Sequence, residues 1–258
     1  TTGGYNTAVG VNALENNTTS SNNTAVGRNA LAVNTTGTGN AAIGALALTA
    51  NTTANYNTGC GYKSLYSNTT GAENTGIGRA ALEYNTTGSS NVAVGNHCLR
   101  NNTTAYNNTA VGHAALSENT TGINNTAIGI EALDANTTAS NNTAIGSAAL
   151  GVNTTGTNNV AVGKDSLAAC TTGGTNVGIG VDALTTLTTG SSNTAVGTGA
   201  FVLALPLSGP RLSVSILLFG TLAGAASPVA AAATSGGGDG GGANGRGGVG
   251  SRQRPRLS

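Results

Sequence analysis

The chain is built on a repeat of 17 residues, and this period constrains the fold more than any other feature. The string NTAVG, or a close variant, begins at residue 6 and recurs in steps of 17, without insertion or deletion, until residue 193. The consensus is N-T-A-[VI]-G-x-x-A-L-x-x-N-T-T-G-x-x, and we number its positions 1 to 17. This unit is shorter than helix-pair repeats of about 33–47 residues and leucine-rich repeats of about 20–29. The period predicts an all-β chain, a β-solenoid of about twelve coils with one coil per repeat.

Some positions of the repeat hardly vary, whereas others carry all the charge. Position 1 is Asn and position 5 is Gly in all twelve copies; position 4 is Val or Ile except at Cys60, and position 9 is Leu except at Phe201. All thirteen charged residues before residue 202 fall at positions 6, 7, 10, 11 or 17. Because burying an unpaired charge is costly, we expect these columns to face solvent and the periodic columns to form the interior and the corners.

Each coil is expected to hold two short strands and two turns. Along a strand at positions 2–4, side chains alternate, so positions 2 and 4 share one face and position 3 takes the other. The branched apolar residue at position 4 predicts that its face lines the coil interior. The Ala or Gly at position 3 indicates a close approach on the second face as well. One helical turn per coil over G-x-x-A-L-x-x-N is the alternative.

The Asn residues at positions 1 and 12 are expected to stack as ladders, with each amide bonding to the next coil at a spacing of about 4.8 Å. The ladder at position 1 consists of Asn6, Asn23, Asn40, Asn57, Asn74, Asn91, Asn108, Asn125, Asn142, Asn159, Asn176 and Asn193. The remaining core is thin, because each coil offers one Leu, one Val or Ile and a few small residues. Sideways association of coils from different copies would therefore supply further burial.

The composition leaves little for catalysis, cofactors or metals. Only 7% of residues are charged, two are His, and the net charge is +1, so no basic field exists to hold nucleic acid. His97 and His113 are expected to be neighbours across adjacent coils, and we predict no metal site from these two side chains. Cys60, Cys98 and Cys170 occupy different positions in distant coils and are interpreted as small core substitutions, not disulfides.

Two further alternatives concern the N-T-T segment at positions 12–14. It forms nine N-glycosylation sequons, from Asn17 to Asn153, but glycans spaced by about 4.8 Å would collide, so a structural ladder is the favoured interpretation. Thr columns also suggest an ice-binding (antifreeze) β-solenoid as the alternative function. Adjacent Thr residues at positions 13 and 14 would point to opposite faces of an extended strand, which leaves one outward Thr column.

The motif N-T-A-V-G-x-x-A resembles the shorter head repeat of YadA-like trimeric autotransporter adhesins, N-S-V-A-I-G-x-x-[SA]. The full A-L-x-x-N-T-T-G-x-x-N-T-A-[VI]-G form is similar to stalk repeats of bacterial and phage tail-fibre-like proteins. The resemblance covers residues 1–201. It implies a left-handed β-roll, a parallel homotrimer and an extracellular location at a cell or virion surface, and it names no receptor or glycan.

We therefore expect a non-enzymatic structural or adhesive fibre segment that acts as a rigid rod. Tyr62, Tyr66, Tyr84 and Tyr106 fall in variable columns of the fourth to sixth coils and are candidate exposed contact residues, with scattered surface Tyr as the alternative. The chain opens within a repeat at Thr1, so we expect a fragment of a longer fibre.

The repeat ends at Phe201 and three segments follow from this: the repeat solenoid at 1–201, an apolar low-complexity segment at 202–234, and a Gly- and Arg-rich tail at 235–258. Residues 212–234 carry no charge and are long enough to span a bilayer. A gene-model or frame artefact is the favoured interpretation of the apolar segment; a membrane anchor and an ordinary low-complexity tail are the alternatives. The final tail is expected to be disordered.

Overall fold

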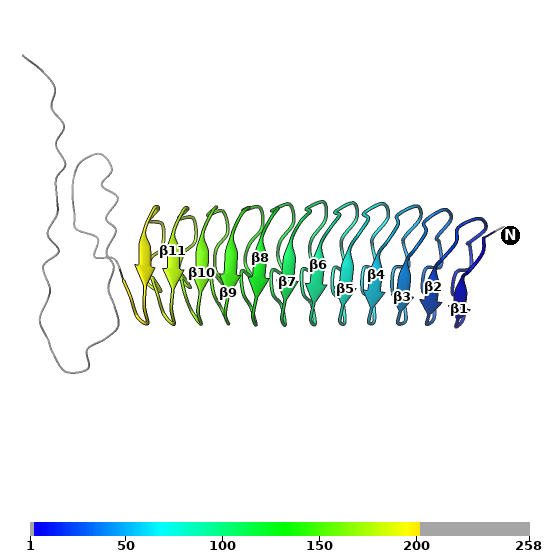
Figure 1. The fold of residues 1–258 in the computed structure, drawn as a ribbon, viewed down its shortest axis with the longest axis horizontal. Coiled ribbons are helices and arrows are strands. Elements are labelled where there is room, and N and C mark those ends of the chain that lie inside the picture. Colours follow the sequence, from blue (N-terminus) through cyan, green and yellow to red (C-terminus); the bar gives the residue numbers. More distant parts are fainter. Residues whose placement is uncertain (1–2, 202–258) are drawn as a thin grey trace, which may run out of the picture. The chain divides into compact units, whose positions relative to one another are not determined.

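The computed structural model describes residues 3–201, so the segments 202–234 and 235–258 lie outside the described residues. Each repeat forms one coil, and the coils stack in sequence order into a β-solenoid (Figure 1). The described residues contain strands and turns but no helix. The prediction of an all-β solenoid from the 17-residue period is confirmed.

All twelve strands fall at positions 2–4 of their repeats. They are β1 (Thr7–Val9), β2 (Thr24–Val26), β3 (Ala41–Ile43), β4 (Thr58–Cys60), β5 (Thr75–Ile77), β6 (Val92–Val94), β7 (Thr109–Val111), β8 (Thr126–Ile128), β9 (Thr143–Ile145), β10 (Val160–Val162), β11 (Val177–Ile179) and β12 (Thr194–Val196). They pair in parallel and in order as one sheet, with each residue opposite the residue 17 positions later, as Ala110 is opposite Ala127.

The expected second strand of each coil is absent from the described residues, and so is the alternative helical turn. Positions 6–11 form a turn in which positions 7 and 9 have positive φ, as at Ala114 (54°) and Leu116 (55°). A left-handed residue at every second position fits neither an extended strand nor a right-handed helix. This local backbone explains why each coil contains one strand only.

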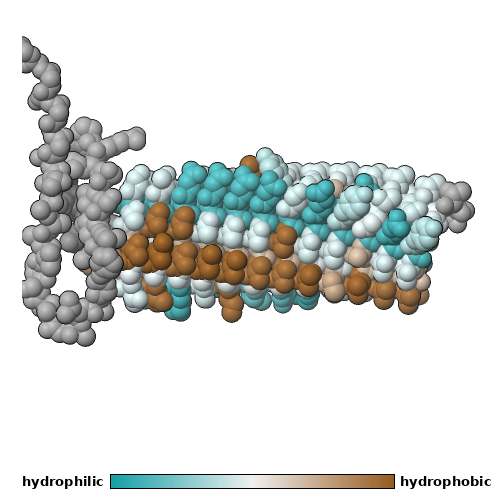
Figure 2. Space-filling model, viewed as in Figure 1, coloured by the Kyte–Doolittle hydropathy of each residue, from teal (hydrophilic) through white to brown (hydrophobic). Residues whose placement is uncertain are grey.

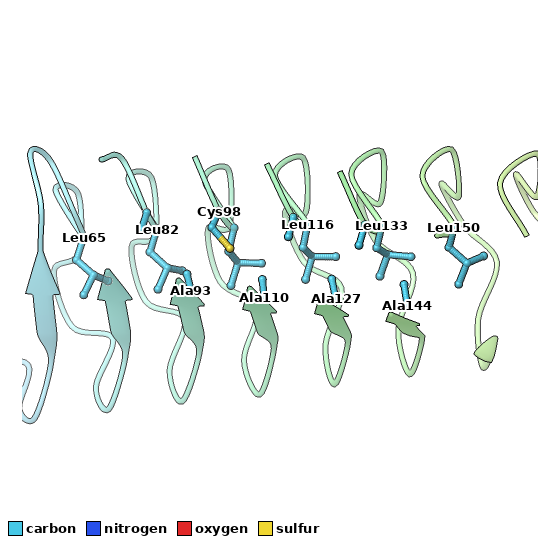
Figure 3. Packing of buried hydrophobic residues seen from close by; sticks show 14 of the residues in the cluster. Leu65, Leu82, Ala93, Cys98, Ala110, Leu116, Ala127, Leu133, Ala144 and Leu150 are labelled. Carbon is cyan, nitrogen blue, oxygen red and sulfur yellow. The ribbon is translucent and has the colours of Figure 1, made fainter. Parts of the chain in front are cut away.

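The core lies behind position 3 of the strands, not behind position 4. Ala at positions 3 and 8 and Leu at position 9 are buried and form one continuous row through the coils (Figure 3). Ala127 is fully buried, whereas the neighbouring Ile128 is 38% exposed. The prediction that position 4 lines the interior is therefore wrong. The Leu of position 9 already fills the narrow coil, so only Ala or Gly fits opposite it.

The Leu residues at position 9 fill this core although their backbone has a positive φ, which is strained for any residue but glycine. Leu116 and Leu133 have φ values of 55° and 54° and are completely buried. A left-handed conformation costs a non-glycine residue roughly 1–2 kcal/mol. Burying a Leu side chain contributes about 1.5–3 kcal/mol. Burial thus offsets the strain, which explains why a large residue occupies a position that glycine would adopt more easily.

The Gly at position 5 is required by both conformation and space. Its φ lies between 129° and 141° in all twelve coils. A methyl group on Gly112 would lie 2.4 Å from the backbone oxygen of Gly129 in the next coil. Any larger residue would therefore push two coils apart at the corner that follows the strand.

Candidate functional site

The Asn side chains at position 1 form a hydrogen-bonded column along the solenoid. The Oδ1 of each accepts a bond from the backbone N–H of the Asn in the next coil, at 2.9–3.0 Å, from Asn6 through Asn193. The members from Asn23 to Asn176 are buried. This column fixes the spacing of successive coils and leaves no amide free for a ligand within its buried stretch.

The Asn residues at position 12 form a second column, and the two columns meet inside each coil. Asn119 Nδ2 donates to Asn102 Oδ1 at 3.0 Å and to the carbonyl of Gly122 at 3.0 Å. Asn108 of the position-1 column donates to the same carbonyl at 2.9 Å. The position-15 carbonyl is therefore the common acceptor of both ladders, and a buried polar seam runs beside the Leu row.

Burial of the second column bears on the sequons. The position-12 Asn residues from Asn34 to Asn153 are fully buried, and each Nδ2 donates within the coil. A glycan on Nδ2 would remove these bonds and has no room in the coil. In the folded solenoid these eight sequons are structural.

The outward face of the strands is uncharged throughout. It combines position 2, usually Thr, with position 4, Val or Ile in eleven coils, and no charged residue occurs at either position. Several position-4 side chains are exposed: Val9, Ile43, Ile77, Ile128, Ile145 and Ile179. We call this surface, positions 2 and 4 of β1 to β12, the sheet face. The alternation of the strand predicted that these positions share a side, but the side is the outer one.

Figure 2 shows the sheet face as a hydrophobic stripe that follows the strands along the solenoid, beside a paler band of Thr. At a strand spacing of about 4.8 Å, twelve strands extend over roughly 50 Å. Contiguous apolar surface of this kind marks interaction sites more often than isolated exposed residues do. The sheet face is the most extended candidate functional surface among the described residues.

The Thr residues at positions 13 and 14 differ in exposure. At position 13 the hydroxyl is engaged, as Thr120 Oγ1 donates to the carbonyl of Thr137 at 2.9 Å. At position 14 all eleven Thr side chains are exposed. One outward Thr column therefore exists at this turn, and a second, interrupted one lies on the sheet face at position 2.

Three of the four candidate contact tyrosines lie in a cluster with charged residues. Lys63 Nζ lies 5.8 Å from the ring centre of Tyr62 and 5.3 Å from that of Tyr66, and it pairs with Glu83 at 3.4 Å. Arg100 lies 5.2 Å from the ring centre of Tyr84. Tyr62 and Tyr84 are exposed, and Tyr66 is half-buried.

Glu83 joins the two halves of this cluster. Its carboxylate is almost fully buried and accepts from Arg100 Nε at 2.8 Å as well as from Lys63. Burial alone would raise the pKa of Glu83, but the hydrogen bonds and positive charges of Arg100 and Lys63 outweigh it, so the pKa is lowered. The buried carboxylate therefore stays ionised between its two cations. Tyr106 is exposed but lies at position 16, outside the columns of this cluster.

The two His residues lie on the same side of the coils without forming a metal site. His97 Nε2 lies 2.6 Å from Arg79 Nη1, and His113 occupies the column of Arg79 one repeat beyond the coil of His97. Between residues 3 and 201, no group of three or more His, Cys, Asp or Glu side chains is placed to hold a metal ion.

The cysteines divide between core and surface. Cys98 and Cys170 are fully buried in place of Ala and Asn, and burial raises the pKa of the Cys98 thiol to about 12. Cys60 stands at position 4 and is half-buried on the sheet face. The interpretation as a core substitution is therefore wrong for Cys60, because its whole column faces outward. All three thiols are free.

Sequence reasoning missed two features of these surfaces. It placed the sheet face inside, although the nearly invariant Leu of position 9 already indicates a filled interior. It also missed the ionic links around Glu83, because Lys63 and Glu83 are separated by 20 residues. With a period of 17, the two residues fall on adjacent coils at positions 7 and 10, so the repeat numbering alone could have predicted that they lie close together.

No helix among the described residues is long and apolar enough to cross a membrane. No family model, no curated protein and no solved structure matches the chain.

Proposed function

We propose that the chain is a non-enzymatic structural fibre segment, a rigid solenoid that associates with copies of itself through the sheet face. The observation that carries this proposal is the outward surface at positions 2 and 4, which continues over all twelve strands without a charge and leaves several of its Val and Ile side chains exposed. A soluble chain that kept such a surface in water would gain nothing from it, whereas burial between chains contributes about 25 cal/mol for each Å² of apolar area.

The partner that best fits this surface is another copy of the same chain. The residues of the sheet face recur once per coil. A second copy has the same spacing between coils, so each of its strands can make the same contact with one strand of the first copy. A flat footprint of roughly 50 Å by 10 Å, from the strand spacing and three residues of width, lies near the lower end of a stable interface. A parallel homotrimer lets each chain use its face against two neighbours, as the resemblance to trimeric adhesin repeats suggests.

The thin core supports the same proposal. Most coils bury one Leu and two small residues, with two Asn beside them. Association would add the position-4 side chain to the buried set of every coil. The result would be a rod at a cell or virion surface that holds a receptor- or glycan-binding element away from that surface, or presents its own variable columns many times over.

Light scattering on the full chain tests this proposal. Across a dilution series in which folding is followed by circular dichroism, we expect a mass three times that of the 24.8 kDa chain. A folded protein that stays at the mass of one chain at every concentration would contradict the proposal.

A second candidate, an ice-binding solenoid, is favoured by one observation. Thr at position 2 and Val or Ile at position 4 share one outward, regular sheet face, so hydroxyl and methyl groups form an ordered grid. The Thr column of this face is interrupted at Ala41, Val92, Val160 and Val177. Thermal hysteresis of the monomeric chain would support this function, and its absence at high protein concentration would exclude it.

A further inference from the structure

The cluster around Glu83 is a positively charged island on an acidic solenoid. Residues 1–201 contain five basic and eight acidic residues, a formal net charge of −3. Three of the five basic residues, Lys63, Arg79 and Arg100, lie in the fourth to sixth coils. Glu83 pairs with Lys63 and Arg100, and no other acidic side chain between residues 3 and 201 pairs with any of the three. The island therefore retains positive charge that the rest of the surface lacks.

Arg79 is the cation of this island that remains available. It is exposed, and among residues 3–201 it forms no ion pair. Its closest polar contact is His97, whose Nε2 lies 2.6 Å from Arg79 Nη1. A guanidinium beside an imidazole, with no carboxylate between them, offers two donors to an anion once the imidazole is protonated.

The surroundings of His97 favour an anionic ligand. Burial lowers its pKa, and the charges of Arg100 and Arg79 lower it further; His113 acts in the same direction, and Glu83 opposes them. His97 is therefore neutral at pH 7 and accepts from Arg79. A carboxylate placed beside both groups would relieve the repulsion and favour the protonated imidazole.

Aromatic surface lies directly beside these donors. Tyr62 occupies the column of Arg79 one coil earlier and is 46% exposed. Asn96 and His113 continue the column of Tyr62 and Arg79 along the next two coils. Successive coils thus present a ring, a guanidinium, an amide and an imidazole at a spacing of about 4.8 Å. This series suits a linear ligand that carries both sugar rings, which pack against aromatic side chains, and acidic groups, which bind cations.

We propose that the strip formed by Tyr62, Arg79, Asn96, His97 and His113 binds a carboxylated polysaccharide that lies along the solenoid. Arg79 and His97 receive a carboxylate, and Tyr62 packs against an adjacent sugar ring. Asn96 and His113 supply hydrogen bonds to further hydroxyl groups. This inference rests on the proposed role as a surface fibre, to which it adds the class of ligand.

Binding of polygalacturonic acid to the immobilised full chain tests the strip, with uncharged dextran of similar size as the reference polymer. We expect saturable binding of the acidic polymer only. Arg79→Gln should weaken it about tenfold or more, because a hydrogen bond to a charged group contributes about 1.5–3 kcal/mol. Arg28→Gln is the matched control, since Arg28 occupies the same position 6 in the second coil, and it should change the affinity less than twofold.

Two further variants separate recognition from general charge. Tyr62→Ala should weaken binding, whereas Tyr56→Ala, which removes an exposed ring at position 17, should not. The affinity should rise as the pH falls from 7.5 to 5.5, and His97→Gln should reduce this dependence. Equal weakening by both Arg variants, or dextran binding as tight as that of the acid, would overturn the inference, as would no binding at all.

The same samples distinguish this inference from the proposed function. Arg79 lies outside the sheet face, so Arg79→Gln should leave the mass in solution and the circular dichroism unchanged. If the chain assembles but does not bind the polysaccharide, the ligand inference alone is overturned. A monomer that binds it through Arg79 would overturn the assembly and retain the binding strip.

Discussion

The Ser64 hydroxyl donates a 2.7 Å hydrogen bond to the carbonyl of Gly76, and a methyl group on Gly76 would lie 2.7 Å from that same hydroxyl oxygen. The two residues occupy position 8 of one coil and position 3 of the next, where Ala is the usual residue. Ser166 and Gly178 show the same arrangement, with a bond of 2.9 Å. In both pairs a Ser at position 8 is matched by a Gly at position 3 of the next coil.

This relationship predicts a coupled pair. Gly76→Ala should destabilise the solenoid by about 1–3 kcal/mol, because the added methyl group overpacks the site and displaces a bonded hydroxyl. Ser64→Ala in the same chain should restore most of that stability, since it recreates the Ala–Ala pair of other coils. Urea unfolding of the two single variants and the double variant measures the coupling. Additive effects would show that the two residues act independently.

Cys170 breaks the position-12 ladder, and the break has a visible consequence. Asn153 Oδ1 is the one buried side-chain nitrogen or oxygen atom without a hydrogen-bond partner in the described part of the chain. In other coils this oxygen accepts from the next Asn, and Cys170 has no amide to offer. Cys170→Asn supplies this donor and should stabilise the protein, by at most about 1 kcal/mol, because Leu187 in the next coil offers no amide to the new Oδ1.

The reverse substitution is the control for this prediction. Asn136→Cys removes the Nδ2 group that donates to Asn119 Oδ1 at 2.8 Å. It should therefore lower the midpoint of thermal unfolding. If Cys170→Asn lowered the midpoint as well, the ladder would not be the source of stability at this position.

The corner glycine predicts the largest single loss. Gly112→Ala should destabilise the chain by about 3 kcal/mol or more, since the residue has a φ of 136° and its Cβ would meet the next coil. Ala114→Gly, two residues later, should change stability by less than about 1 kcal/mol, because relief of its left-handed strain opposes the added freedom of the unfolded chain. Chemical unfolding of both variants compares them, and similar losses would contradict the assignment of the corner.

The thiols give a pH-dependent prediction. The Cys98 pKa of about 12 exceeds that of a thiol in the unfolded chain, so the folded state retains a proton that the unfolded state loses. Its contribution to stability is complete below the ordinary thiol pKa and is lost as the pH rises toward 12. Cys98→Ala, which restores the common residue of position 8, should reduce the loss of stability between pH 8 and pH 10. An unchanged pH profile would contradict the burial of this thiol.

Much of the fold could be predicted from the sequence because the period is unbroken. The step of 17 fixes one coil per repeat, and a column of Asn such as Asn108 and Asn125 indicates stacking. The orientation of the strand was harder to predict, because the alternation of side chains defines two faces but does not show which of them lies inside the coil. The size of Ile128 suggested the interior, but Leu133 already fills the coil and Ala127 is the residue that fits beside it.

The candidate binding strip shows the same limit. The sequence placed Tyr62 and Tyr84 in variable columns and predicted their exposure. It did not predict the contacts of Lys63 and Arg100 with Glu83, because a charged column is expected to face solvent, whereas Glu83 is buried. Glu83 is buried at position 10 beside Lys63 and Arg100, whose long cationic side chains reach it from the adjacent coils.

The central claim, that the sheet face is buried between copies, is tested most directly by inserting a charge there and measuring the mass of the full chain in solution. Ile128→Arg places a charge on the face, and Ile130→Arg places one two residues away on an exposed side chain outside it. We expect Ile128→Arg to reduce the assembly to single chains or raise its dissociation constant at least a hundredfold, while Ile130→Arg remains a trimer. A trimer that survives both substitutions, or is lost equally with both, would contradict the claim.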